Sequence, residues 1–216
     1  MLQKYQKLTL SLVDLVNRSL GRKVQTLNTL APVQTRNNLI EAYRMAHQLG
    51  LCAGTMGELS LRIDGSKLLI TPSKAWPESL EIAELILAGI EYEWIDAHAE
   101  PPAFLDWHRA IYASTDAQAI LFSQPAAAIV LGRLRRAVDL HQPTILSTHS
   151  GGISWAEPET GAIVAALKDH AVVLIREHGM ITRAGNINEA VSRSHSAERL
   201  CMIVLQEALF MDLDKR

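Results

Sequence analysis

The histidines, and the serine beside one of them, are the residues whose types most directly suggest chemistry. His149 precedes Ser150 and two glycines, an order that could activate a serine nucleophile. A nucleophile elbow needs a strand, a sharp turn and a helix around the serine, and the flanking sequence does not show that order. The eight histidines include no H-x-H, H-E-x-x-H or H-x₃-H pair, so their spacing alone predicts no zinc site. A polar loop is the better interpretation of residues 149–152.

Two further stretches could bind anions. Gly54-Thr55-Met56-Gly57 is rich in glycine, but a predicted helix precedes it and a predicted strand follows. Phosphate-cradling loops have the opposite order, strand and then helix. Arg133, Arg135 and Arg136 form a small basic cluster that fits a solvated helix face better than a nucleic-acid site. Neither stretch predicts nucleotide or nucleic-acid binding.

The elements that must position these residues alternate between helix and strand. Apolar spacing and end signals predict helices over residues 2–20, 34–49 and 77–88, near Pro102 onwards, over 161–167, and from Asn186 through Leu209. Asn186 followed by Glu189 resembles a capping box. Strands are predicted over residues 59–63 and 67–71, joined by a hairpin turn at Asp64-Gly65, and over 119–123, 144–147, 172–175 and 180–182. The pattern indicates a mixed α/β protein.

Composition narrows the class of protein. A chain of 216 residues, 48% hydrophobic and 20% charged, is typical of a globular domain, and a net charge of −2 gives no reason to expect nucleic acid or an acidic membrane as partner. Cys52 and Cys201 lie far apart and form no metal or redox motif, which favours a reducing cytoplasm. The longest apolar run, residues 125–132, is too short to span a bilayer, and the N-terminus shows no signal-peptide pattern. We expect a soluble cytoplasmic protein.

Several sequence motifs, taken together, resemble those of one family. They are Gly50-Leu51, then Gly54-Thr55-x-Gly57-x-x-Ser60-x-Arg62, Leu69-Ile70-Thr71-Pro72-Ser73, His108-x-x-Ile111-Tyr112, and Val173-Leu174-Ile175-Arg176-Glu177-His178-Gly179 followed by Gly185 and Glu189-Ala190. In order and spacing they resemble the class II aldolase/adducin family. The resemblance covers about residues 34–210, so residues 1–33 are predicted to be an N-terminal helical extension and residues 34–216 the family domain. It implies a three-layer α/β/α domain around a mainly antiparallel sheet, assembled as a homotetramer.

The resemblance implies a zinc ion in active members, held by an H-x-H pair on one strand and by the histidine of a His-Gly dipeptide. Here Phe122 and Gln124 stand at the pair, and only His178 matches. Phenylalanine offers no lone pair, and a neutral amide is a poor zinc ligand. The family's catalytic glutamate position, four residues before His108, holds Phe104. We therefore expect neither bound zinc nor the carboxylate needed for general acid/base catalysis.

The substrate-phosphate pocket implied by the resemblance is altered as well. The family's Gly-Asn is Gly57-Glu58 here, and an anionic side chain there would repel a phosphate. The family's paired serines are Pro102 and Ala103, and its Thr-Pro-Ser-Gly ends in Lys74. The residues predicted to line this vestigial pocket are Thr55, Gly57, Glu58, Ser73, Lys74, Phe104, His108, Phe122, Gln124 and His178.

Three functions fit this pattern of losses. The first is a non-catalytic or regulatory domain that binds a small molecule or a protein. We favour it because the substituted residues are concentrated in the family's site, whereas the motifs that belong to the fold are kept. The second is a divergent aldehyde-lyase or epimerase acting on a small sugar-like substrate through a rearranged site. The third is metal-free imine chemistry at Lys74, which nothing in the sequence supports, because no burial or neighbouring cation that would depress the lysine pKa is evident.

Overall fold

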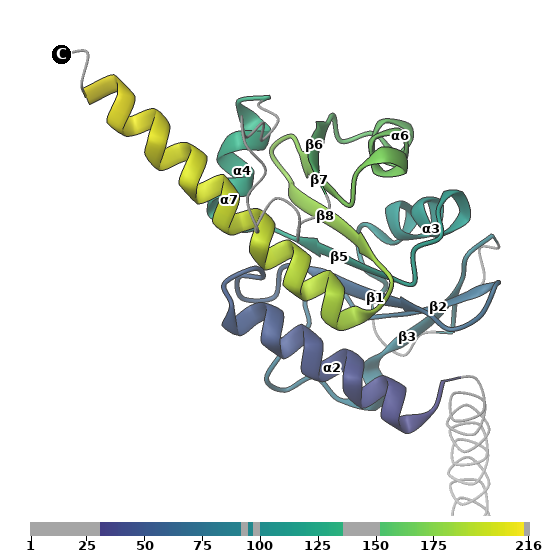
Figure 1. The fold of residues 1–216 in the computed structure, drawn as a ribbon. Helices are drawn as coiled ribbons and strands as arrows, with labels where there is room; N and C mark the ends of the chain where they lie inside the picture. Colours follow the sequence, from purple (N-terminus) through teal and green to yellow (C-terminus); the bar gives the residue numbers. More distant parts are fainter. Residues whose placement is uncertain (1–30, 92–94, 97–99, 136–151, 214–216) are drawn as a thin grey trace, which may run out of the picture.

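A computed structural model describes residues 31–91, 95–96, 100–135 and 152–213 (Figure 1). The predicted helix over residues 2–20 and the predicted strand over 144–147 lie outside these ranges. The helical elements are α2 Val33–Gln48, η1 Ile82–Glu84, α3 Leu105–Ser114, α4 Ala126–Arg133, α6 Thr160–Asp169 and α7 Ile187–Leu213. The strands are β1 Glu58–Arg62, β2 Lys67–Ile70, β3 Ile86–Gly89, β4 Ile95–Asp96, β5 Ala119–Ser123, β6 Ile153–Ala156, β7 Val172–Ile175 and β8 Gly179–Ala184.

The strands form one eight-stranded sheet in the order β4-β3-β2-β1-β5-β8-β7-β6. Each neighbouring pair is antiparallel except β6 and β7, which are parallel. In the register of the central strands, Ser60 of β1 lies opposite Ile120 of β5, and Leu121 of β5 lies opposite Thr182 of β8. The predicted mainly antiparallel sheet is confirmed.

Alternating side chains give the sheet two covered faces. Leu59, Leu121 and Leu174 point to the face under α2, α4 and α7, whereas Phe122 and Ile181 point to the face under α3 and α6. In Figure 1, α2 and α7 run side by side on one face, and α3 and α6 lie on the other. This is the predicted three-layer α/β/α arrangement.

The helix predicted over residues 77–88 is wrong. The structure has only the short 3₁₀ helix η1 there, and the next residues form β3, whose register pairs Leu87 with Leu69 of β2. Ile86 and Leu87 are both buried, because successive side chains of this strand join the hydrophobic cores on opposite faces of the sheet. A short continuous apolar run of this kind fits a buried strand as well as a helix, so periodicity could not separate the two.

The last helix begins where the capping signal predicts. Asn186 Oδ1 accepts the backbone N–H of Glu189 at 2.9 Å, and Glu189 Oε2 accepts the N–H of Gly185 at 2.6 Å. The reciprocal cap therefore reaches one residue further back than in the standard capping box. α7 then runs for 27 residues, about 40 Å. None of the helices in the described ranges is long and apolar enough to cross a bilayer.

Candidate functional site

Residues from β1, β5 and the start of α3 meet on the α3 face of the sheet. Glu58 lies directly opposite Phe122 in the antiparallel register of β1 and β5. Residues opposite each other point to the same side of a sheet, here toward α3. Phe104 directly precedes α3, and His108 lies within its first turns. Four of the predicted pocket residues therefore come together from three elements.

Four rings form an aromatic cluster at this meeting point: Phe104, Trp107, Phe122 and His178. Phe104 stacks on Trp107 with ring centroids 4.3 Å apart, and its centroid lies 4.6 Å from that of Phe122. The His178 ring meets Phe104 at 5.8 Å and Trp107 at 5.7 Å, in both cases edge-on. Phe122 is fully buried. The cluster fills the space with apolar rings, which gain contact energy from packing but offer no ligand atoms.

The His178 imidazole is the only metal-ligand type in the cluster. Its Nδ1 lies 2.7 Å from the carbonyl oxygen of Arg176, and since a carbonyl can only accept, Nδ1 carries the proton. Nε2 is then left with the lone pair. His178 is half-buried, and the residue after it, Gly179, begins β8.

The residues present do not fit the family's three-histidine zinc site. Phe122 has no donor atom, and Gln124 offers an amide whose Oε1 is buried with no hydrogen-bond partner among the described residues. Within the described ranges, no three His, Cys, Asp or Glu side chains lie close enough together to hold a metal ion. Zinc prefers imidazole, thiolate and carboxylate ligands, so one imidazole and one amide make a weak site.

A glycine at the end of the His-Gly dipeptide allows the strands to approach closely. Gly179 has a φ of +116°, and a Cβ there would lie 2.9 Å from the Cα of Gln124 and closer still to the carbonyl oxygen of Ser123. Glu177 also has a positive φ, +61°. This turn therefore holds His178 against the end of β5 through backbone geometry that L side chains rarely adopt.

Beside the aromatic cluster lies a buried polar network made of Glu58, Ser60, His108 and Tyr112. Glu58 Oε1 accepts the N–H of Phe104 at 3.2 Å, and Glu58 Oε2 lies 3.5 Å from His108 Nε2. Ser60 Oγ lies 2.7 Å from His108 Nδ1 and 2.8 Å from the Tyr112 hydroxyl. None of the four residues is more than 6% exposed.

One arrangement of protons fits the short contacts of this network, while His108 Nε2 and Glu58 Oε2 face each other at 3.5 Å without forming a hydrogen bond. Tyr112 donates to Ser60, Ser60 donates to His108 Nδ1, and the proton on His108 Nε2 faces the Glu58 carboxylate. Burial raises the pKa of Tyr112 well above its ordinary value, so its hydroxyl remains a neutral donor. The network therefore connects a carboxylate near the aromatic cluster with a phenol deep under α3.

Arg62 packs against Tyr112, the last residue of this network. Its guanidinium lies 5.0 Å from the centroid of the Tyr112 ring and donates to the carbonyl oxygens of Tyr112 and, at 3.0 Å, Ala117. These carbonyls lie at and just after the end of α3, where helix carbonyls lack partners. Arg62 thus fixes α3 against β1.

The other predicted pocket residues lie on the loops around this centre. Thr55 and Ser73 are half-buried, and Gly57, with a φ of +103°, packs against Cys52. Lys74 is 74% exposed and pairs with Glu100 at 3.0 Å. Its partner is not Glu58, and it lies in solvent rather than in the buried surroundings of an imine-forming lysine. The absence of imine chemistry at Lys74 stays a prediction.

Fold and sequence together now define the class of protein. Residues 37–205 match the family model described as Class II Aldolase and Adducin N-terminal domain. The match covers well over half of the chain, which therefore belongs to the class II aldolase and adducin family.

The chain is similar to several characterised relatives. It is 26% identical to the 5-methylthioribulose-1-phosphate/5-deoxyribulose-1-phosphate aldolase of Rhodospirillum rubrum over 78% of this chain and 79% of the relative. It is also 26% identical to the methylthioribulose-1-phosphate dehydratase of Yersinia enterocolitica, over 79% and 91% of the two chains. Among solved structures, an L-fuculose 1-phosphate aldolase superposes with a TM-score of 0.77 at 20% identity, covering 84% of this chain and 89% of that one. At 20% identity, the similarity to this aldolase structure shows a shared fold and nothing about activity.

Proposed function

We propose that this chain is a binding domain that keeps the class II aldolase fold without zinc-dependent chemistry, and that it takes a small molecule or a protein as its ligand. The observation that carries the proposal is the aromatic cluster. Phe104 and Phe122 occupy two positions where the resemblance implies polar groups, and their centroids lie only 4.6 Å apart. Apolar rings in contact with one another favour packing over catalysis.

The chemistry of the relatives explains why this substitution matters. A metal ion acting as a Lewis acid stabilises the negative charge that develops on a substrate oxygen. Among the described residues of the aromatic cluster, His178 is the one imidazole that could bind such an ion, beside the buried amide of Gln124. An ion held by so few ligands is neither tightly bound nor fixed in orientation.

Turnover of the relatives' substrates tests the proposal. The full chain, supplied with zinc, is incubated with 5-methylthioribulose 1-phosphate and with L-fuculose 1-phosphate, and product is followed by mass spectrometry. An L-fuculose phosphate aldolase serves as the positive control. We expect no product above the protein-free rate. Saturable product formation that scales with the amount of chain would contradict the proposal.

A second candidate is a divergent aldehyde-lyase or epimerase acting on a small sugar-like substrate. The buried polar network favours it, because Glu58 places a carboxylate, backed by His108, beside the backbone of Phe104. A carboxylate–imidazole pair is a common source of general acid/base catalysis. If any activity is found, Glu58→Gln should abolish it, and Glu100→Gln, which alters an exposed carboxylate, should not.

Assembly and location belong to the same proposal. The end of α7 carries Leu209, Phe210 and Met211, which are 62%, 66% and 67% exposed, and in Figure 1 it extends beyond the sheet. Exposed apolar side chains in this number favour a subunit interface, and we propose a closed homotetramer. Light scattering that gave the monomer mass of 23.8 kDa would contradict it.

Cys52 and Cys201 are free and buried, which fits a reducing cytoplasm.

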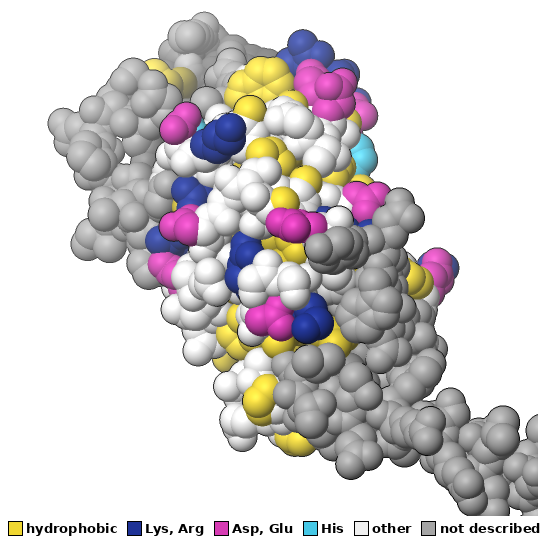
Figure 2. Space-filling model, turned by 90° about the vertical axis from the view of Figure 1, so that its right-hand side faces the viewer, with side chains coloured by type: hydrophobic (Ala, Val, Ile, Leu, Met, Phe, Trp, Pro, Cys, Tyr) yellow, Lys and Arg dark blue, Asp and Glu magenta, His cyan; other side chains and the backbone are white. Residues whose placement is uncertain are grey.

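On the described part of the face drawn in Figure 2, no extended area of one charge supports a nucleic-acid partner. In Figure 2, basic and acidic side chains intermingle with isolated hydrophobic ones over the described atoms of the visible face. This mixture agrees with the small net charge of −2.

A further inference from the structure

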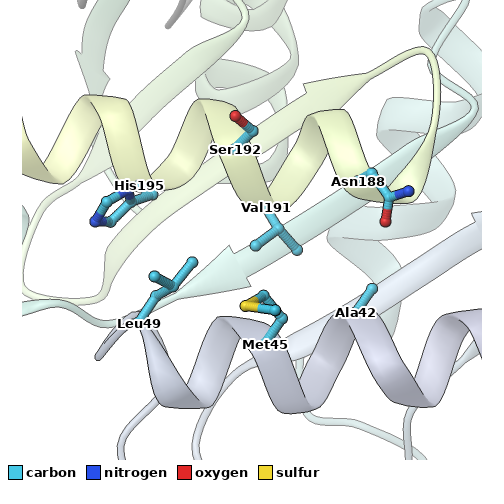
Figure 3. A pocket seen from close by; sticks show the side chains of 7 residues that line it. All are labelled: Ala42, Met45, Leu49, Asn188, Val191, Ser192 and His195. Carbon is cyan, nitrogen blue, oxygen red and sulfur yellow. The ribbon is translucent and has the colours of Figure 1, made fainter.

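A groove lies between α2 and α7, on the face of the sheet opposite the candidate site. Its volume is about 230 Å³. Figure 3 shows Met45 on α2 and Val191 on α7 pointing toward each other across it. The lining residues are Ala42, Met45, Leu49, Asn188, Val191, Ser192 and His195.

The groove has an apolar side and a polar side. Ala42 and Val191 are buried, while Met45 and Leu49 remain 49% and 37% exposed along α2. Asn188 and His195 supply polar atoms from α7. Cavities that hold small-molecule ligands usually measure about 300–1,000 Å³. This groove is smaller and open, so it fits side chains projecting from a protein segment better than a small molecule.

The chain itself supplies a segment with matching chemistry. Residues 1–30 lie two residues before α2 in the sequence and outside the described ranges. Apolar side chains in this segment recur at helical spacing, at Leu2, Tyr5, Leu8, Leu12, Leu15 and Val16. An amphipathic helix of this kind needs an apolar partner surface, because a helix of this length is marginal alone in water.

Length and connectivity allow the segment to reach the groove. Residues 2–20 as a helix would measure ~28 Å, close to the ~24 Å of α2. Residues 21–32 connect the two and span up to ~40 Å when extended, more than the length of α2. The segment can therefore lie along α2 in either direction.

The charges of the two parts are complementary. Residues 1–30 carry a net charge of +4, from the basic residues Lys4, Lys7, Arg18, Arg22 and Lys23 and the acidic residue Asp14. Since the whole chain carries −2, residues 31–216 carry −6. Glu41, exposed one turn before Met45 on α2, places part of that negative charge beside the groove. The attraction favours docking of the segment on its own domain.

We infer that residues 2–20 form an amphipathic helix that docks in the α2–α7 groove of the same chain, with its apolar stripe over Met45 and Leu49. The segment then covers the apolar side chains that the groove would otherwise expose to water. The inference is independent of the proposed function, because the groove and the candidate site lie on opposite faces of the sheet.

The reactivity of a thiol placed in the groove tests the inference. Met45→Cys introduces a thiol at an exposed position, and its rate of reaction with a maleimide is measured in the full chain. Cys52 and Cys201 give little background, because burial raises the pKa of each thiol to about 12. The test variant adds Leu8→Asp and Leu12→Asp on the apolar stripe. The matched control adds Gln3→Asp and Asn17→Asp, which introduce the same charge on the opposite side of the predicted helix.

We expect Met45→Cys to react at least about tenfold faster when combined with the stripe substitutions, and at an unchanged rate when combined with the control. Equal rates in all three proteins would overturn the inference. So would equal acceleration by both pairs, because docking through the apolar stripe requires a face-specific effect. Protection that survives the stripe substitutions and disappears on dilution would show that a second copy covers the groove instead.

Discussion

The Glu58 carboxylate lies 3.5 Å from the imidazole Nε2 of His108, with side chains that are 8% and 0% exposed. The two residues come from β1 and α3, and the pair is held at both ends, by the Phe104 N–H and by Ser60. A buried carboxylate is costly to desolvate, so it must be stabilised by the groups around it. The contact fastens the first turn of α3 to the sheet beside the aromatic cluster.

Removing the Glu58 carboxylate should therefore destabilise the fold. Glu58→Ala leaves the Phe104 N–H without its acceptor and removes the carboxylate that faces His108, which should lower the free energy of unfolding by about 1–3 kcal/mol. Urea denaturation followed by circular dichroism measures this. Glu100→Ala is the matched control, because Glu100 is 62% exposed in its pair with Lys74, and it should change stability by less than about 1 kcal/mol. Equal effects of the two substitutions would show that the buried contact adds no more to the free energy of unfolding than an exposed ion pair does.

A methyl group at Gly179 should be poorly tolerated. The residue has a φ of +116°, and an added Cβ would press on the backbone of Ser123 and Gln124. We expect Gly179→Ala to cost at least about 2 kcal/mol of unfolding free energy. Gly161→Ala is the control, since no atom lies within 4 Å of a Cβ there, and it should leave thermal stability unchanged or slightly higher. A neutral Gly179→Ala would mean that β5 and β8 can separate at this point.

Glu198 should make stability depend on pH. This α7 carboxylate accepts the N–H groups of Ala127 and Ala128 at the start of α4, both at 2.9 Å. Burial raises the pKa of Glu198, although the two backbone donors oppose the shift. The folded state then binds the proton more tightly than the unfolded state, so this group's contribution is full below its unfolded pKa and is lost as pH rises through the folded value.

The measurement is the urea midpoint across about pH 4 to 7, a range that begins near the ordinary glutamate pKa. Glu198→Gln should flatten the fall in stability that this residue causes, and Glu207→Gln, at an exposed position on the same helix, should retain it. A slope unaffected by Glu198→Gln would contradict the assignment.

The fold was more predictable from the sequence than the site, and there are physical reasons why two strands were not predicted. The spacing of apolar residues and the turn residues at the ends predict five elements close to their observed bounds: strands β1, β2, β5 and β7 and helix α2. β3 was missed because it is buried on both faces, and β6 because its four residues carry no alternation. Short buried or edge strands of this kind depend on partners that are distant in sequence.

In the structure, Phe104, Phe122 and His178, which the resemblance places in one pocket, have rings in contact with one another. The polar network was not predicted, because it depends on how α3 docks on β1. A signal for it exists in hindsight: Glu58 and Ser60 are two apart on a strand, and His108 and Tyr112 are four apart on a helix. Each pair therefore shares one face. Trp107 was not among the predicted pocket residues, although its ring belongs to the aromatic cluster.

Restoring the family's histidine pair should restore zinc affinity. Positions 122 and 124 lie two apart at the end of β5, and His178 keeps its Nε2 lone pair. Phe122→His with Gln124→His should bind zinc at least about tenfold more tightly than Phe122→His alone, measured by calorimetry. Without Phe104→Glu, the double variant should still not turn over sugar phosphates. Unchanged affinity would show that His178 does not face the restored pair.

The zinc content of the unmodified protein separates a zinc-free binding domain from a metal-dependent enzyme. The full chain is purified without chelator, and its metal content is measured by plasma mass spectrometry against protein concentration. Because Phe122 and Gln124 stand where two histidine ligands are implied, we predict far less than one zinc ion per chain. About one zinc ion per chain, retained through dialysis, would contradict the account and favour the divergent lyase.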